Sequence, residues 1–164
     1  MNFIIFIIMT VAARSITRHQ NQKPVRLYSK TGRHLTISKS GSVGSTIEHD
    51  SSISLTKMES TGHDEFVIKS VETNLYLSAK RMRKSGSKSL RLRATSSQRE
   101  ALRLSENVME NNFNQYSLKN NKNCKLAMRS SGKFRILCNA QNDSRKNNRN
   151  IFDFLPRRVH NHRL

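Results

Sequence analysis

The sequence contains the same short phrase three times, and this repetition is the feature that most restricts its fold. Leu35–Val43 reads LTISKSGSV and Leu126–Phe134 reads LAMRSSGKF, so apolar, polar and glycine positions coincide. A looser third copy begins at Leu77 and reaches its glycine, Gly86, after several extra basic residues. The copies begin 42 and 49 residues apart, a spacing that indicates a supersecondary unit repeated in space.

Short runs of alternating apolar residues predict that each unit is built from β-strands. VRLYS, HLTIS, EFVIKSV, LYLSA and FRILC place apolar residues at every second position, and Gly, Ser, Asn and Asp separate such runs. The best helical candidate, residues 99–108, fits a strand equally well. One unit of about four strands cannot bury its apolar face alone, whereas three units packed around an axis can. The sequence therefore predicts an all-β barrel of about twelve strands with threefold repetition.

The charge of the chain indicates the kind of partner it binds. The 164 residues suffice for one domain with a real core. Thirty Lys and Arg residues face only 11 Asp and Glu residues, so the formal net charge is +19. A charge of this size favours polyanions, which include nucleic acid, anionic membrane and sulfated polysaccharide.

The N-terminal segment is predicted to be a secretory signal. Residues 3–11 are almost wholly apolar, and the small residues Ala12 and Ala13 follow. The run is about half of the roughly 20 residues that a membrane span needs. We therefore expect a signal peptide over residues 1–13, a secreted product, and no membrane insertion after cleavage. The alternative is an uncleaved hydrophobic anchor.

The rest of the chain divides by composition into an arm, a domain and a tail. Residues 14–24 have no apolar period and are expected to form a flexible arm. The β-domain is expected over residues 25–156, followed by a basic tail over residues 157–164.

The two cysteines test the hairpin of the third repeat. Cys124 and Cys138 each lie seven positions from Ser131, so they face each other if the chain turns at Ser131. Directly opposed β residues have Cβ atoms about 4.5–5.5 Å apart, which a disulfide reaches with local adjustment. An even cysteine count in a secreted chain fits a disulfide, and the alternative is two buried free thiols.

Four segments, in this order and spacing, resemble the fibroblast growth factor family. They are RLYSKTGRHLTI, NLYLSA, ENNFNQYSL and FDFLPRRV, and the similarity covers roughly residues 25–159. The resemblance implies a β-trefoil, that is, three pseudo-repeats of about four strands. It also implies a secreted ligand that binds and activates a receptor tyrosine kinase with heparan sulfate as co-receptor.

The resemblance implies a receptor-binding surface made largely of tyrosine and polar side chains. Tyrosine combines a rigid apolar body with a polar tip, and such residues dominate interface energetics. Phe113 stands where tyrosine is common in the family, which leaves the choice of receptor open. The implied receptor-binding residues are Tyr28, Glu110, Asn114, Tyr116 and Leu155.

A heparin-binding surface is implied by the same resemblance. Arg binds sulfate and carboxylate groups with a planar fork, and Lys binds them as a point charge. Glycines that usually shape the loop after Cys138 are absent here, which puts the conformation of that loop in doubt. The implied residues are Lys30, Thr31, Arg129, Ser130, Lys133, Arg135, Lys146, Arg149 and Asn150.

Two further sequence features bear on this surface. The basic run over residues 80–93 either extends the polysaccharide footprint, resembles a nuclear-localisation patch, or is simply a solvated face. Asn142 begins an N-glycosylation sequon, and a glycan there would crowd polysaccharide in the predicted heparin loop.

Other classes of function fit less well. The sequence has no nucleotide-binding loop, no Gly-x-Ser-x-Gly elbow and no His-Glu-x-x-His helix, so we expect no enzyme, no metal and no cofactor. An intracellular or nuclear β-trefoil that binds nucleic acid or kinase scaffolds is the main alternative, although the preferred interpretation expects no nucleic acid. A trefoil lectin is disfavoured because the chain has no tryptophan.

Overall fold

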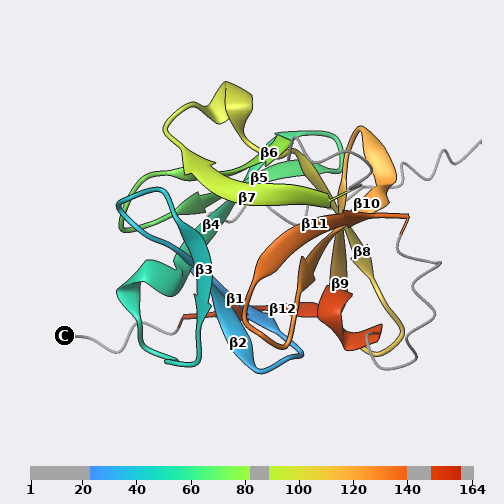
Figure 1. The fold of residues 1–164 in the computed structure, drawn as a ribbon, viewed down its shortest axis with the longest axis horizontal. Coiled ribbons are helices and arrows are strands. Elements are labelled where there is room, and N and C mark those ends of the chain that lie inside the picture. The colour runs from blue at the N-terminus through green and yellow to red at the C-terminus, as the bar shows by residue number, and fades with distance from the viewer. Residues whose placement is uncertain (1–22, 82–88, 140–148, 160–164) are drawn as a thin grey trace, which may run out of the picture.

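A computed structural model of the chain describes residues 23–81, 89–139 and 149–159 (Figure 1). The predicted signal peptide, residues 14–22 of the predicted arm, Gly86, the sequon at Asn142, and Lys146 lie outside the described residues. Twelve strands run through the described ranges: β1 (Val25–Ser29), β2 (Arg33–Ile37), β3 (Val43–Thr46), β4 (Leu55–Gly62), β5 (Glu65–Ser70), β6 (Tyr76–Arg81), β7 (Ser89–Thr95), β8 (Leu104–Val108), β9 (Asn114–Leu118), β10 (Asn121–Met128), β11 (Phe134–Cys138) and β12 (Phe154–Arg158). Three described 3-10 turns accompany them: η1 (Ser52–Ser54), η2 (Gln98–Glu100) and η4 (Arg149–Phe152).

Six of these strands close into an antiparallel barrel. β1 pairs with β4, β4 with β5, β5 with β8, β8 with β9 and β9 with β12, and β12 returns to β1. Closure gives each of the six strands a hydrogen-bonded neighbour on both sides, which removes open sheet edges. The last described strand, β12, therefore closes the barrel by pairing with the first, β1.

The other six strands form three hairpins, β2–β3, β6–β7 and β10–β11. Each is attached to the barrel through its first strand, β2 to β1, β6 to β5 and β10 to β9. A six-stranded barrel with three hairpins is a β-trefoil, so the predicted fold is confirmed. Within residues 99–108, for which the sequence left helix and strand open, Arg99 and Glu100 belong to η2 and Leu104–Val108 form β8.

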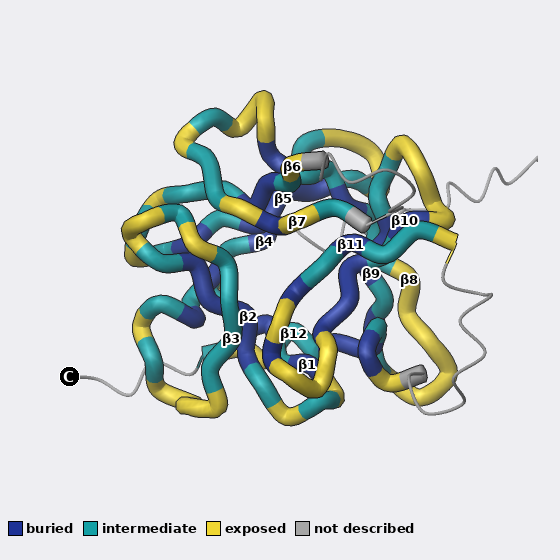
Figure 2. The backbone as a smooth tube through the Cα atoms, in the orientation of Figure 1, coloured by how far each residue is buried: buried dark blue, intermediate teal, exposed yellow. Residues whose placement is uncertain are grey.

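The three sequence repeats occupy equivalent places in the fold, as the repetition predicts. Leu35, Leu77 and Leu126 lie on β2, β6 and β10, the first strands of the three hairpins, and all three are fully buried. Figure 2 shows the buried positions along these strands in dark blue. Each repeat thus contributes one leucine to the same core from an equivalent place.

The glycines of the repeat have a conformational reason. Gly41 and Gly132 have φ angles of 79° and 78°, in the left-handed region that favours glycine. Each donates its backbone N–H to the carbonyl of the residue three positions earlier, Gly41 to Ser38 at 3.0 Å and Gly132 to Arg129 at 2.8 Å. The phrases LTISKSGSV and LAMRSSGKF therefore encode the same turn.

The chain has no tryptophan, and phenylalanine and tyrosine rings fill the centre of the core. The ring centroids of Phe66 and Tyr116 lie 5.6 Å apart, those of Tyr116 and Phe154 5.9 Å, and those of Phe154 and Phe134 5.9 Å. These four rings come from β5, β9, β12 and β11, so one continuous aromatic contact joins barrel strands to a hairpin strand. Such pairs add about 0.5–1.5 kcal/mol each beyond area burial.

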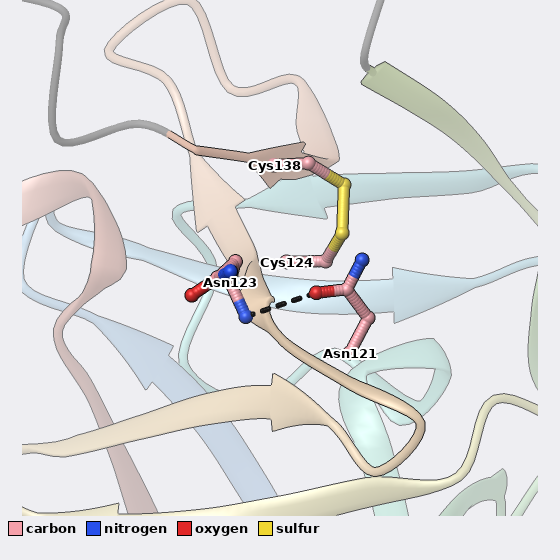
Figure 3. The surroundings of a disulfide bond; sticks show 4 residues. All are labelled: Asn121, Asn123, Cys124 and Cys138. Atoms are coloured by element: carbon pink, nitrogen blue, oxygen red, sulfur yellow. Dashed lines mark hydrogen bonds between the residues drawn. A yellow bond between two sulfur atoms is a disulfide. The ribbon is translucent and has the colours of Figure 1, made fainter.

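The third hairpin carries the two cysteines. Cys124 and Cys138 are direct partners in the β10–β11 register, as counting from Ser131 predicts. Figure 3 shows the disulfide that joins them, next to a hydrogen bond of 3.1 Å from the backbone N–H of Asn123 to the Asn121 side chain. The bridge closes a loop with a sequence separation of 14 residues.

We predict that replacing both cysteines by alanine lowers the free energy of unfolding by about 3 kcal/mol, because a bridge closing a loop of about 15 residues constrains the unfolded chain by that amount. Denaturant unfolding with and without reductant checks this, with the double variant as the control that reductant should not affect. Two alkylatable thiols in the oxidised wild type would contradict the bond.

Candidate functional site

Tyr28 and Leu155 come from opposite ends of the chain and lie side by side. Tyr28 on β1 is the direct partner of Leu155 on β12, and directly opposed residues share one face of a sheet. The neighbours of Tyr28 on β1, Leu27 and Ser29, are buried, so Tyr28 faces away from the core. Two residues expected on a receptor-binding surface are therefore adjacent on the outside of the barrel.

Two further side chains hold the Tyr28 ring. The guanidinium carbon of Arg157 lies 3.6 Å from the ring centroid, and the His34 ring centroid lies 5.1 Å away. A cation over an aromatic face is attracted by the ring quadrupole. The sequence prediction missed both residues, although Arg157 follows Leu155 by two positions and so shares its face of the strand.

The β8–β9 turn continues this surface. Asn114 is the partner of Phe154 on β12. Because the two strands are antiparallel, this register places Phe113 opposite Leu155, on the outer side of the sheet. Glu110 is exposed on the turn, and Met109 is 38% exposed. We use the term outer strip for Tyr28, Phe113, Leu155 and Arg157.

Asn114 lies on the inner side of β9 at the margin of the outer strip. It is 9% exposed, and its amide donates a hydrogen bond to the Glu106 carboxylate. The same carboxylate oxygen accepts the hydroxyl of Tyr116 at 3.2 Å. Asn114 is thus held at the edge of the core rather than presented freely.

Tyr116 does not belong to the outer strip, which corrects the sequence prediction. Its side chain is fully buried, its ring packs on Phe66 and Phe154, and burial raises its pKa well above the usual value. Tyr116 shares the inward face of β9 with Asn114, two positions earlier. A side chain in the core cannot contact a partner protein, so the role of Tyr116 is to fill the barrel.

The turn of the third hairpin, which carries several basic residues, contacts the first hairpin. Arg129, Ser130 and Lys133 are exposed on the β10–β11 turn, and Arg135 follows on β11. At the same turn the Ser45 hydroxyl donates to the Gly132 carbonyl at 2.8 Å.

Arg33 joins this turn and was missed by the sequence prediction. A Cβ placed on Gly132 would lie 3.4 Å from the Arg33 guanidinium and 2.6 Å from the Ser45 hydroxyl oxygen, so only glycine leaves room for them. Arg33 stands close to Lys30 in the chain but far from Gly132, and no local signal connects the two turns. We use the term basic end for Arg33, Arg129 and Lys133.

Lys30 lies between the basic end and the outer strip. Its ammonium is 5.1 Å from the Phe113 ring centroid and 3.6 Å from an Asp153 carboxylate oxygen. Its backbone N–H donates to the Asp153 carbonyl at 2.9 Å. Lys30 is therefore partly engaged by an internal carboxylate.

The remaining predicted heparin-binding residues are only partly brought together. The Thr31 hydroxyl is hydrogen-bonded to the Ser29 hydroxyl at 3.0 Å. Asn150 is exposed in η4, where its carbonyl accepts the backbone N–H of Asp153 at 3.3 Å. Lys146 and the side chain of Arg149 lie outside the described residues.

The described ranges contain neither a metal-binding cluster nor a membrane-spanning helix. Residues 23–81, 89–139 and 149–159 contain no group of three or more His, Cys, Asp or Glu side chains that could hold a metal ion. The same part of the chain contains no helix long and apolar enough to span a membrane.

His34 is a buried imidazole beneath the outer strip. Its Nε2 is hydrogen-bonded to Nδ1 of His49 at 3.1 Å, and its own Nδ1 is buried without a partner in the described structure. Burial, together with positive charge on His49, Arg157 and Arg26, lowers the pKa of His34 from 6.5 to about 4. The folded protein thus holds this imidazole neutral.

One comparison with known proteins identifies a family. The family model for the fibroblast growth factor matches residues 23–152, which include every described strand from β1 to β11. No curated protein matches the chain as an individual relative.

We predict that His34 makes folding less favourable in acid. Between pH 6.5 and pH 4 the unfolded chain binds a proton at this position and the folded chain does not, so the free energy of unfolding falls as pH is lowered through that window, by about 2 kcal/mol between pH 7 and pH 5. Denaturant unfolding at several pH values measures the slope.

The variant His34→Phe should flatten that slope, whereas His63→Gln, on the exposed β4–β5 turn, should leave it unchanged. An equal slope in wild type and His34→Phe would contradict the assignment to His34.

Proposed function

The chain belongs to the fibroblast growth factor family, whose members are signalling ligands rather than enzymes, and on that premise we propose that it is secreted and activates a receptor tyrosine kinase with heparan sulfate as co-receptor. The observation that carries the proposal is the direct pairing of Tyr28 with Leu155. It gives two residues of the family's receptor-binding motifs one common surface.

The outer strip has the chemistry of a receptor-binding surface. Tyr28, Phe113 and Leu155 supply apolar area, and Arg157 adds a guanidinium already stacked on a ring. Side chains that are held in place before binding lose less conformational entropy on association. Glu110 and Asn114 would add polar contacts at the rim, whereas Tyr116 would support the strip from the core.

The basic end suits a sulfated polysaccharide. Three described cations, Arg33, Arg129 and Lys133, come together there from two hairpins. Thr31, Ser130 and Asn150 would contribute neutral hydrogen bonds, and Lys146 and Arg149 would extend the surface. The polysaccharide would act by raising the local concentration of ligand at the receptor, without any bond being made or broken.

Residues 1–13 would direct the protein out of the cell, and a glycan would be attached at Asn142. A glycan at that position would lie in the loop that leads from β11 to η4, close in sequence to Arg149 and Asn150. It would crowd polysaccharide in the predicted heparin-binding segment of the sequence.

We predict that Tyr28→Ala and Leu155→Ala each weaken receptor binding by about tenfold or more, because interface aromatic and apolar anchors contribute about 1–2 kcal/mol or more when truncated. Protein expressed with residues 1–13 and collected from culture medium is tested on a panel of receptor ectodomains, with receptor phosphorylation in cells as the second measurement.

The matched control is Tyr76→Ala, a half-buried tyrosine on β6 away from the outer strip. Unchanged binding in the Tyr28 and Leu155 variants would refute the receptor surface. Retention of the protein inside cells would favour the intracellular alternative.

We predict that Arg129→Ala with Lys133→Ala elutes from heparin at lower salt and reduces the slope of log affinity against log salt by about 1.5–2, because two counterion-releasing contacts are lost. The matched control, Lys39→Ala with Arg99→Ala, removes the same charge from exposed positions elsewhere. Equal elution of the two double variants would refute the basic end.

A further inference from the structure

A line of cations crosses three neighbouring strands outside the basic end. Lys80 on β6 is the direct partner of Arg91 on β7, and Arg91 is the direct partner of Arg135 on β11. Directly opposed residues lie on one face of the sheet, and adjacent strands are about 4.8 Å apart, so the three positions span about 10 Å. We use the term cation ladder for Lys80, Arg91 and Arg135.

The cation ladder faces away from the core. On β7, Leu92 is 6% exposed and belongs to the core, whereas Arg91 is exposed. On β11, Phe134 and Ile136 are buried on either side of Arg135, which is half-buried. Lys80 is exposed on β6. The three side chains therefore belong to the outer face of β6, β7 and β11, strands that Figure 1 shows next to one another.

This arrangement has an electrostatic cost. Like charges directly opposite each other destabilise a strand pair, and here the opposition occurs twice in succession. The opposed pair Lys57 and Lys69 has a carboxylate nearby, since Lys69 lies 3.9 Å from Glu59.

The Glu100 carboxylate, in η2, contacts β7 at residues outside the ladder. Glu100 forms an ion pair of 3.1 Å with Arg93 and also accepts the Thr95 hydroxyl at 3.1 Å. A bound polyanion would offset the repulsion within the ladder.

The cation ladder is continuous with the basic end. Lys133 precedes Arg135 by two positions, so the alternation of a strand places both on the same side of the chain. From Arg135 the ladder continues across β7 to β6, away from the β10–β11 turn. A polymer lying on the basic end thus meets a second row of cations without leaving the surface.

The spacing favours a polymer with closely repeated anions. Three cations in a row suit successive sulfate groups better than a single phosphate, since Arg can bind each sulfate with its fork and Lys as a point charge. Single-stranded nucleic acid binding also uses aromatic platforms for bases. None of the three ladder positions is aromatic. The described tyrosine nearest to them in sequence is Tyr76, and its hydroxyl donates a hydrogen bond of 3.4 Å to the Glu59 carboxylate.

We propose that the cation ladder is a second contact strip for sulfated polysaccharide, which rests on the proposed polysaccharide binding at the basic end and extends it across β7 to β6. One long chain would contact both regions, whereas a short oligosaccharide would be held mainly at the basic end. Long chains would then bind more tightly than short ones by the effective-concentration effect.

The test compares Lys80→Gln with Arg91→Gln against Arg129→Ala with Lys133→Ala, on full-length protein, using long heparin and a short heparin oligosaccharide. We expect the ladder variant to lose about tenfold in affinity for long heparin, to reduce the salt slope by about 1.5–2, and to bind the short oligosaccharide as wild type does. The basic-end variant should lose affinity for both probes.

The outcomes separate the two proposals. No binding of wild type to either probe would overturn both. Binding by wild type and loss in the basic-end variant, with a ladder variant that behaves like Lys39→Ala with Arg99→Ala, would overturn the ladder alone. Equal or tighter binding of single-stranded RNA, weakened by the same ladder substitutions, would overturn the assignment to sulfated polysaccharide.

A stability measurement guards against a folding artefact. Because Lys80 and Arg91 repel each other, their replacement should leave the free energy of unfolding unchanged or raise it at low salt. A destabilised ladder variant would show instead that these side chains serve the fold, which would overturn the proposal.

Discussion

The pairing of β1 with β12 is the constraint on which the rest of the molecule depends. Five residue pairs, from Val25 with Arg158 to Ser29 with Phe154, join the first described strand to the last. This pairing closes the barrel and gives both strands a neighbour on each side. It also forms the outer strip, because Tyr28, Leu155 and Arg157 meet only when the two ends of the chain are adjacent.

Asp153 shows how so basic a protein uses one of its few carboxylates. The side chain is 5% exposed, and a buried charge needs partners. Its two oxygens accept the amides of Asn111 and Gln115, each at 3.0 Å, and Lys30 lies 3.6 Å away. Gln115 in turn accepts the Lys125 ammonium at 2.9 Å. One carboxylate thus ties the β1–β2 turn, the β8–β9 turn and β10 together, and so sets the position of the outer strip relative to the basic end.

The burial of Tyr116 shows that local sequence alone does not identify which residues of a motif face outward. Alternation along ENNFNQY separates its residues into two faces but does not say which face is buried. Tyr116 and Asn114 lie on the inner face because Phe66 and Phe154, from β5 and β12, meet them there. The outward position then belongs to Phe113, which the same motif contains and which sequence reasoning treated as a departure. Which side of a strand is the interior depends on what packs against it, and that information lies elsewhere in the chain.

The sequence by itself determined the local geometry: strands from alternation, turns from glycine, and the opposed cysteines from equal distance to Ser131. These features depend on neighbours within one hairpin, so short patterns are enough to specify them. Only the tertiary structure decided that Arg33 reaches Gly132, that Arg91 stands opposite Arg135, and that Tyr28 lies beside Leu155. The reason is physical: these contacts join different hairpins or opposite ends of the chain, so they depend on how the closed barrel and the three hairpins pack together rather than on any single segment.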